Sequence, residues 1–586
     1  MKDEQKCEIP YFDPFSPEAM RAFHKKDYKP CNDLPPLTYI EQLWNNDTVN
    51  LYFNLSALDS YDLSDNDTLN CCYQVVTRTK EDDSGVELTN CEYFDSWPIQ
   101  LSAEIEFLLV QCNTKPLPNK TSIVVYKNAH VLVRKKPEVL KRIEDKSSEA
   151  KKPLSVLLIG IDSVSRLNLM RAMPKTSQYL NENGWIEMKG YNKIEENTFP
   201  NLMAILTGFN QTIACDVCNP QTQGKLDSCP IIWYKFRDQG YATAYAEDQR
   251  YIGTFNYLRA GFTSPPVDHY FRPFGIAAER FFSNNTCLGY KHYGELIYQY
   301  AVDLAKQYKG KPYFGLYWTN SFSHDDVSLP SSMDEKMRDY LLELNDIGSL
   351  NETIVVFFSD HGMRYGAMRE QPSGWYEERL PFIFFSLPEW FKREYPEFTE
   401  NLKINADRLT TPFDLHWTLK HILSISTETN NTNDEEYAGL YCPKSQSLFH
   451  KIPYNRSCDD ACITEQWCTC MHYVKLDKSS LMAKSAVDFV IQKINEDLAK
   501  LENKCAKLKL KEILHASVRI RLSEEKFTYY RAAFVALPSN GEFEFTVKHD
   551  NGTNVFQLAG EISRLNMYGD QGKCIDDVTL IKYCYL

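Results

Sequence analysis

Four short apolar runs in this chain, each typical of a buried β-strand, end at acidic or histidine residues. The runs and the residues that follow them are 157–161 before Asp162, 242–246 before Glu247 and Asp248, 313–318 ahead of His324, and 353–358 ahead of Asp360 and His361. Such runs alternate with helical patterns between about residues 154 and 425, which predicts an α/β fold with a parallel sheet sandwiched by helices. Ligands bind beyond the carboxyl ends of the strands in such sheets, so we expect these side chains to converge on one edge. Any one of them alone is equally consistent with a turn or a helix cap.

Residues 196–208 form a predicted helix with a threonine at its start. Thr198 lies at the expected N-cap, Pro200 falls in the first turn, and Gly208 ends the helix. A hydroxyl at a helix N-terminus faces free backbone N–H groups and the positive end of the helix dipole, and both stabilise a phosphate or sulfate built on that oxygen. Thr198 is therefore either an ordinary capping residue or, beside a metal cluster, a nucleophile.

The pattern along the chain divides it into three predicted regions. Residues 1–150 form a Cys-rich, β-rich N-terminal domain, and residues 151–440 form the α/β catalytic domain. Residues 441–586 form a Cys-rich C-terminal region of mixed α+β character. Its residues 484–504 have apolar positions at helical spacing, and short β-type runs with turns at 539–541 and 551–552 follow from residue 513.

The charge balance excludes one large class of partners. The chain has 65 basic and 79 acidic residues, a net charge of −14. Nucleic-acid binding requires clustered Lys and Arg, so we expect no nucleic-acid partner. The sequence also contains no run of 18 apolar residues, the length that a membrane-spanning helix needs.

Eighteen cysteines and ten N-x-S/T sequons indicate an oxidising compartment. Zinc-binding cysteines would need paired C-x-x-C units, and only Cys215 and Cys218 have that spacing, so disulfides are the favoured interpretation. We expect a secreted, extracellular or lumenal protein with N-linked glycans. The first six residues lack the apolar core of a signal peptide, so we expect an upstream signal or membrane anchor that this chain lacks.

Taken together, these residues resemble the alkaline phosphatase superfamily, which also contains sulfatases, phosphodiesterases and phosphoethanolamine transferases. Thr-Phe-Pro-Asn at 198–201, followed by Leu-Thr-Gly, resembles the phosphodiesterase nucleophile segment, and Ser-Asp-His-Gly at 359–362 resembles the metal motif. Residues 376–383 and 411–419 resemble the sulfatase segments after that motif. Ser-His-Asp-Asp at 323–326, with the Cys-rich flanks, resembles an uncharacterised extracellular invertebrate family, a domain of unknown function.

The resemblance implies an alkaline-phosphatase-like fold and one metal site, with Asp162, Thr198, Asp360 and His361 as its ligands. Two carboxylates and an imidazole suit zinc better than calcium or manganese. Thr198 would attack phosphorus to give a phospho-threonine, which water or another acceptor would release. Further expected substrate contacts are Asn201, Glu247, Asp248, Asn320, Asp325 and Arg379. Glu247 and Asp248 are expected to bind a cationic head group such as ethanolamine or choline.

Two departures from the superfamily patterns narrow the function. Formylglycine sulfatases need Cys or Ser where this chain has Thr198, and Arg where it has Leu202. The second zinc site of the phosphatases needs an Asp where this chain has Asn320, four residues before His324. One metal is therefore expected, with a second site left open. His324 is then a general acid, an anion ligand or a structural loop residue.

These patterns favour a metal-dependent hydrolase or phosphotransferase that acts on phosphodiesters or on phospho-substituted glycans or lipids. The alternatives are a sulfatase-like hydrolase with an atypical nucleophile and a catalytically silent binding ectodomain. The complete set of Asp162, Thr198, Asp360 and His361 favours an enzyme, and the incomplete second metal site favours the silent ectodomain.

Overall fold

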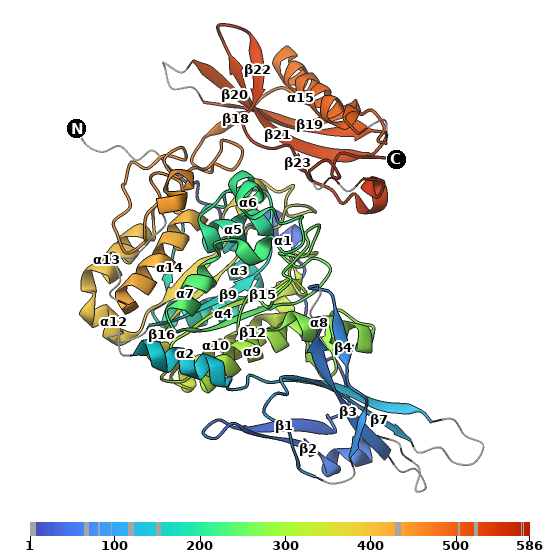
Figure 1. The fold of residues 1–586 in the computed structure, drawn as a ribbon. Helices are drawn as coiled ribbons and strands as arrows, with labels where there is room; N and C mark the ends of the chain where they lie inside the picture. Colours follow the sequence, from blue (N-terminus) through green and yellow to red (C-terminus); the bar gives the residue numbers. More distant parts are fainter. Residues whose placement is uncertain are drawn as a thin grey trace.

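The computed structural model describes residues 7–61, 63, 69–79, 82–94, 97–114, 122–147, 154–427, 435–501, 504–520, 526–575, 577 and 579–586. A seven-stranded sheet lies at its centre (Figure 1). The strands are β9 (Ser155–Ile161), β10 (Ile186–Glu187), β11 (Ala242–Glu247), β12 (His269–Tyr270), β15 (Tyr313–Thr319), β16 (Thr353–Phe358) and β17 (Ile383–Ser386). Their order across the sheet is β10-β17-β16-β9-β15-β11-β12.

The five strands from β12 to β16 are parallel, and β17 is antiparallel to both of its neighbours. The predicted parallel, helix-covered sheet is therefore confirmed, with one antiparallel strand near an edge. The four predicted strands are β9, β11, β15 and β16, and they are adjacent. Their carboxyl ends lie on one edge of the sheet, as expected.

Both faces of this sheet are buried, which explains its continuous apolar strands. Along β9, Leu157 and Ile159 enter one apolar core, whereas Val156 and Leu158 enter the core on the other face. The first core is covered by α3 (Arg166–Ala172), α4 (Pro174–Glu182), α8 (Arg272–Phe282), α9 (Tyr293–Gln307) and α10 (Asp334–Asp346). The second is covered by α5 (Thr198–Thr207), α6 (Gln211–Cys218), α7 (Ile232–Asp238), α12 (Glu389–Glu394), α13 (Pro396–Asn405) and α14 (Pro412–Thr427).

Two small antiparallel sheets precede the central unit. One contains β1 (Thr38–Leu43), β2 (Thr48–Phe53) and β6 (Ile99–Gln100). The other contains β3 (Leu69–Arg78), β4 (Val86–Leu88), β5 (Glu92–Phe94), β7 (Phe107–Thr114) and β8 (Val124–Val131). The helices α1 (Pro17–Ala22) and α2 (Pro137–Ser147) flank them in the chain, and β13 (Cys287–Leu288) pairs with β14 (Lys291–His292). The second sheet contacts α8, which joins this region to the first core.

A six-stranded antiparallel sheet follows the central unit, at the opposite end of the molecule from β1–β8 (Figure 1). Its strands are β18 (Tyr473–Lys475), β19 (Lys509–Arg519), β20 (Phe527–Leu537), β21 (Gly541–Asp550), β22 (Val555–Leu558) and β23 (Ser563–Arg564). The predicted helix 484–504 is α15 (Leu481–Ala499), which packs on this sheet through Val487, Val490 and Ile494. The predicted turn at 539–541 joins β20 to β21, with Asn540 at φ 49°. The domain boundaries at 150 and 440 stay predictions.

A buried network of ion pairs fixes the C-terminal sheet to the central unit. Glu544 on β21 accepts hydrogen bonds from Arg369 at 2.7 Å and from Arg379 at 3.0 Å. Arg379 ends α11 (Gly374–Arg379) and is fully buried, as is Glu544. Glu378, beside it, accepts from Lys193 at 2.7 Å. This network determines where the C-terminal sheet lies relative to the carboxyl edge of the central sheet.

Eight disulfides confirm the predicted use of the cysteines and indicate an oxidising compartment. The pairs are Cys7–Cys470, Cys31–Cys287, Cys71–Cys112, Cys72–Cys91, Cys218–Cys229, Cys442–Cys462, Cys458–Cys468 and Cys505–Cys584. Cys215 and Cys574 are free thiols.

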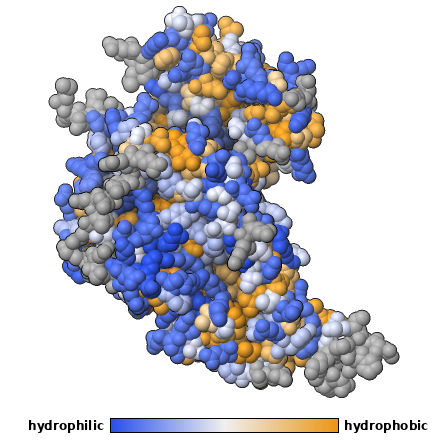
Figure 2. All heavy atoms as spheres, viewed as in Figure 1, coloured by the Kyte–Doolittle hydropathy of each residue, from blue (hydrophilic) through white to orange (hydrophobic). Residues whose placement is uncertain are grey.

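The visible face of the central unit is mostly hydrophilic, and hydrophobic side chains gather nearer the two ends of the molecule (Figure 2). None of the helices within the described ranges combines the length and apolar character needed to cross a membrane.

Candidate active site and metal centre

A strained turn presents Asp162 at the end of β9. Ser163, the next residue, adopts φ 61°, a left-handed conformation that is uncommon for a non-glycine residue and that occurs at functional sites. Its backbone N–H donates to Asp360 Oδ1 at 3.2 Å, which ties the ends of β9 and β16 together. Asp162 itself is fully buried. The turn therefore holds its carboxylate at the carboxyl edge of the sheet.

Asp360 and His361 follow β16 and are also buried. Asp360 Oδ1 accepts from the backbone N–H groups of Ser163 and His361, which fixes the carboxylate. Its other oxygen, Oδ2, lies near His361 Nε2. His361 Nδ1 lies 2.9 Å from the Gly362 carbonyl oxygen, so Nδ1 carries the proton and Nε2 presents a lone pair. Burial lowers the pKa of His361 to about 4, so this imidazole is neutral at neutral pH.

These three side chains converge on one point. His361 Nε2 lies 3.1 Å from Asp360 Oδ2 and 3.7 Å from Asp162 Oδ1. Asp162 Oδ2 and Asp360 Oδ2 are buried oxygens without a hydrogen-bond donor in the described part of the chain. Burial raises the pKa of Asp360 to about 6, with the neighbouring charge of Asp162 as a further cause. Two buried carboxylates with unsatisfied oxygens beside a neutral imidazole are costly alone and fit a divalent cation.

Thr198 lies directly beside this cluster. It is the first residue of α5, whereas Asn197, in extended conformation, is the N-cap. The predicted N-cap position of Thr198 is therefore wrong by one residue, while the predicted C-cap Gly208 is confirmed by its left-handed φ of 78°. The Thr198 hydroxyl donates to Asp162 Oδ1 at 3.2 Å. The helix start thus points a hydroxyl group at the candidate metal ligands.

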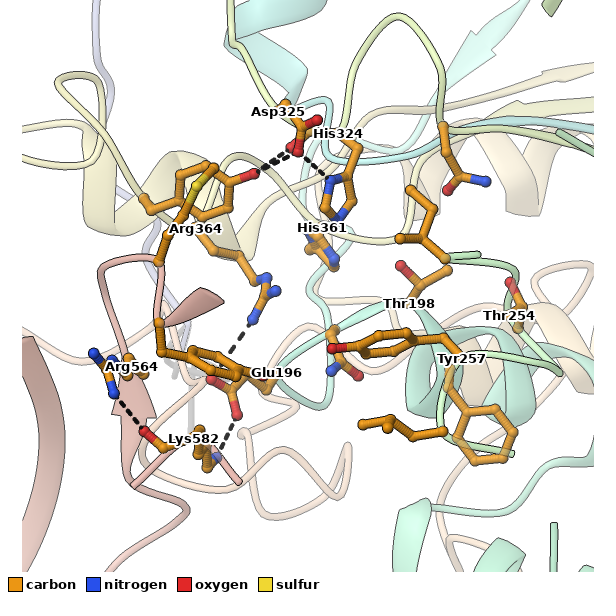
Figure 3. Close-up of a pocket in the computed structure, with 18 of the residues that line it drawn as sticks. Glu196, Thr198, Thr254, Tyr257, His324, Asp325, His361, Arg364, Arg564 and Lys582 are labelled. Carbon is orange, nitrogen blue, oxygen red and sulfur yellow. Dashed lines mark hydrogen bonds and ion pairs between the residues drawn. The ribbon is translucent and has the colours of Figure 1, made fainter. Parts of the chain in front are cut away.

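His324 lies in the loop after β15 and also faces the cavity (Figure 3). Its Nδ1 lies 2.7 Å from Asp325 Oδ1. Burial acts to lower the pKa of His324, but the hydrogen bond that His324 donates to Asp325 and the charges of Asp162 and Asp325 outweigh it and raise the pKa above its ordinary value. A protonated imidazole in this position is able to donate a proton.

The cavity in front of these residues has a volume of about 420 Å³. Its floor contains Thr198, His361 and His324, and its rim contains Tyr257 and Leu258 from the loop after β11. The opposite wall comes from the C-terminal region. The residues of this wall are Glu561, Arg564, Asn566, Met567, Tyr568, Gly569, Thr579 and Lys582. The cavity is therefore formed jointly by the central sheet and the C-terminal region.

The structure does not support substrate contact by Glu247 and Asp248. Neither residue lines the cavity. Asp248 is fully buried and accepts from the backbone N–H groups of Asn320 and Ser321. Glu247 accepts from the backbone and hydroxyl of Thr254. Both carboxylates are engaged in shaping loops, so the cavity gives no support to their predicted role in binding a cationic head group, which stays a prediction.

Asn201 and Arg379 also lie outside the cavity lining, whereas Asn320 and Asp325 line it as expected. Asn201 is fully buried and bonds to the backbone of Ile194, Glu195 and Asn197, which shapes the turn before Thr198. Arg379 belongs to the buried ion-pair network under the C-terminal sheet. Both side chains have a structural role in this fold, and their expected contact with substrate stays a prediction that the cavity lining does not support.

Asn320 is fully engaged within the protein, which bears on the second metal site. Its Oδ1 accepts from Trp318 at 3.2 Å, and its Nδ2 donates to Asp248 Oδ1 at 3.2 Å. An amide whose oxygen and nitrogen are both bonded to protein is a poor metal ligand. The expectation of one metal instead of two stays a prediction.

Sequence analysis missed several residues that line the cavity, among them Glu196, Tyr257, Arg364, Tyr568 and Lys582. Arg364 was within reach of sequence reasoning, because it follows the Ser-Asp-His-Gly motif by two residues. Lys582 was not, because it lies 386 residues from its partner Glu196 and no local pattern marks it.

A sequence profile of the family described as "Protein of unknown function (DUF229)" matches residues 24–514. The chain belongs to this family. The expected assignment to a family of unknown function is thereby confirmed. No curated protein sequence matches the chain.

The chain is also similar to several solved structures, among them the following three. A protein of the alkaline phosphatase superfamily from Vibrio parahaemolyticus is 11% identical, with 72% of this chain and 90% of that chain covered and a TM-score of 0.36. The lipoteichoic acid synthase LtaP from Listeria monocytogenes is 12% identical, with 76% and 96% covered and a TM-score of 0.35. The PsFucS1 sulfatase from Pseudoalteromonas sp. is 11% identical, with 58% and 79% covered and a TM-score of 0.32.

Proposed function

We propose that this chain is a metal-dependent hydrolase or transferase of phosphoric esters that acts through a phospho-threonine at Thr198. One observation carries the proposal: two buried carboxylate oxygens that have no donor among the described residues and the unprotonated Nε2 of a neutral histidine meet beside the Thr198 hydroxyl. That arrangement is costly as a purely structural feature and useful as a catalytic one.

Asp162, Asp360 and His361 would hold the metal, and two carboxylates with one imidazole suit Zn²⁺. When bound, the ion would lower the pKa of the Thr198 hydroxyl and stabilise negative charge on the substrate. The hydrogen bond from His361 Nδ1 to the Gly362 carbonyl keeps Nε2 unprotonated and fixes the plane of the ring.

The chain's own residues account for both halves of the reaction. In the first half, the deprotonated Thr198 oxygen bonds to phosphorus, the bond to the leaving alcohol breaks, and His324 donates a proton to that alcohol. The N-terminus of α5 stabilises the negative charge that gathers around Thr198 Oγ. In the second half, water gives a proton to His324 and bonds to phosphorus, and the bond to Thr198 breaks. An alcohol in place of water would give transfer instead of hydrolysis.

The substrate class and the compartment belong to the same proposal. A cavity of about 420 Å³ with tyrosines on two sides suits a phosphodiester or a phospho-substituted glycan or lipid. The eight disulfides and the ten sequons support a secreted, extracellular or lumenal location with N-linked glycans.

Metal analysis combined with turnover tests this function. Purified protein never exposed to chelator is assayed for bound metal and for hydrolysis of bis(4-nitrophenyl) phosphate, 4-nitrophenyl phosphate and 4-nitrophenyl sulfate. We expect one zinc per chain and turnover of a phosphoric ester. Thr198→Ala should abolish turnover, while Thr207→Ala, at the far end of the same helix, should not. Turnover of the sulfate ester alone, or metal-free protein, would contradict the proposal.

A further inference from the structure

Among the described cations that line the cavity, Arg364 has the least engaged donors. It lies three residues after His361, and its half-buried side chain lines the cavity. It makes no hydrogen bond to the described part of the chain, and its guanidinium is 3.6 Å from Glu196 Oε1. Figure 3 shows Arg364 between His361 and Glu196, facing the cavity that Thr198 also faces. An arginine held in place with its fork of donors free is suited to bind an oxyanion.

Glu196 and Lys582 explain how Arg364 is held there. Lys582 Nζ donates to Glu196 Oε2 at 2.6 Å, which leaves Oε1 to face Arg364. Both side chains of this ion pair are largely buried, at 14% and 10% exposure. A buried carboxylate between two cations has little freedom to rotate, so its position fixes the guanidinium beside it.

Lys582 is itself fixed by the C-terminal region. Its carbonyl oxygen accepts from Arg564 at 2.9 Å, and Cys584, two residues later, is bonded to Cys505. Tyr568, which also belongs to the C-terminal wall of the cavity, is hydrogen-bonded to Tyr257 of the central unit. This wall lies beyond residue 514, where the match to the family profile ends.

We propose that Arg364 binds the non-bridging oxygens of the group transferred to Thr198, and that Lys582, through Glu196, is a positioning residue for Arg364. The ligand class is a tetrahedral oxyanion such as a phosphoryl group. The C-terminal region thereby completes the active site from outside the part of the chain that the family profile matches. This inference rests on the proposed function and names the residues that recognise its substrate.

The charge balance of the site supports this assignment. A transferring phosphoryl group carries negative charge on its equatorial oxygens, and enzymes stabilise it with metal ions and arginine. This chain has Asn320 where the phosphatases that it resembles have an Asp ligand of a second metal, so only one ion is expected. One ion supplies less positive charge than two. Arg364 lines the same cavity as Thr198 and supplies a further positive charge there.

Binding of inorganic phosphate to the full, metal-loaded chain tests the inference by calorimetry, together with metal content, kcat and KM. Arg364→Gln should lower kcat by about 10²- to 10³-fold, as loss of one oxyanion donor does, and should weaken phosphate binding without loss of metal. Arg338→Gln, on the exposed side of α10, is the matched control and should change neither. Unchanged phosphate affinity and kcat in Arg364→Gln would overturn the assignment of Arg364.

The positioning role of Lys582 needs its own variants. Lys582→Gln should lower kcat roughly 10-fold or more through misplacement of Arg364, and Lys582→Arg should restore most of it. Lys573→Gln, which removes an exposed lysine of the same region, is the control. If Lys582→Gln fails to fold, the double variant Glu196→Gln/Lys582→Met avoids an unpaired buried charge and should show the same loss. Activity and phosphate affinity equal to those of Lys573→Gln would overturn this role.

Failure of the inference and failure of the proposed function are distinguishable. If no ester is turned over but phosphate binding depends on Arg364, the oxyanion site stands and the proposed function falls. If turnover depends on Thr198 but neither turnover nor phosphate binding depends on Arg364, the inference alone falls.

Discussion

Replacement of Glu544 by Gln tests how the C-terminal sheet is attached to the central unit. Glu544 is fully buried and accepts from Arg369 at 2.7 Å and Arg379 at 3.0 Å. Burial acts to raise the pKa of Glu544, but the charges of Arg369, Arg379 and Arg531 outweigh it and lower the pKa from 4.5 to about 2. A difference of that size corresponds to about 3 kcal/mol of stability at pH 7. We therefore expect Glu544→Gln to destabilise the C-terminal sheet by about 3 kcal/mol.

The sign of the pH dependence follows from the lowered pKa. The stabilisation is complete above pH 4.5, the ordinary value, and is lost as the pH falls toward 2. At pH 3 the expected difference between wild type and Glu544→Gln is about 1.4 kcal/mol, less than half of its value at pH 7. Below pH 2 the two proteins should be equally stable, because the wild-type carboxylate is then protonated.

Hydrogen exchange of peptides from β20 and β21, measured by mass spectrometry, reports this local stability directly. At pH 7 the variant should exchange about 100-fold faster, since 1.4 kcal/mol corresponds to tenfold. Glu512→Gln is the matched control, because Glu512 is an exposed carboxylate on β19 of the same sheet. The reasoning would be refuted if the difference in exchange rate between wild type and Glu544→Gln were the same at pH 7 and pH 3.

Three further predictions concern the site and its surroundings. Chelation of the wild-type protein, and the substitutions Asp360→Asn and His361→Ala, should each remove the metal. Calorimetry should then give all three proteins a similar unfolding temperature, below that of the untreated wild type, and an unfolding temperature of the wild type that chelator does not change would contradict the metal site. His324→Gln should slow the turnover of esters with alkyl leaving groups by about 10²- to 10⁴-fold and leave the turnover of 4-nitrophenyl esters unchanged. Turnover by the wild type should fall as the pH rises through the raised pKa of His324, and the variant should not show this fall. Equal slowing of both kinds of ester would exclude His324 as the general acid. Arg379→Gln should destabilise the protein by about 3 kcal/mol or more with KM unchanged, and a selective rise in KM would restore its earlier assignment to the substrate site.

The central sheet was predictable because its strands are buried on both faces. The run predicted at 353–358 has the same limits as β16, and all of its residues are buried. Strand ends were equally informative, since Asp162, Asp360 and His361 follow directly from β9 and β16. The helix at Thr198 was displaced by one residue because the extended Asn197 takes the N-cap position, although its side chain makes no capping hydrogen bond, and the Thr198 hydroxyl bonds to Asp162 instead.

Side-chain direction at the sheet edge was not predictable. Glu247 and Asp248 lie at the expected edge, but hydrogen bonds from Thr254, Asn320 and Ser321 draw their carboxylates into the loops. Residue spacing gives no information on such bonds, because they depend on where two loops meet.

The C-terminal wall of the cavity was unpredictable for a different reason. Lys582 meets Glu196 because Glu544 and its arginine partners dock a separate sheet over the carboxyl edge of the central sheet. Contacts between regions hundreds of residues apart leave no periodic pattern in one sequence.

Trapping of the covalent intermediate tests the central claim most directly. Metal-loaded protein is mixed with excess bis(4-nitrophenyl) phosphate, quenched in acid within the first turnovers, digested and analysed by mass spectrometry. An adduct that carries phosphorus and the remaining 4-nitrophenyl group should appear on the peptide that contains residues 198–207, with fragmentation that places it on Thr198. Thr198→Ser should carry the adduct at the same position, and Thr198→Ala should carry none. Turnover by Thr198→Ala at the wild-type rate, or an adduct on another residue, would contradict the account.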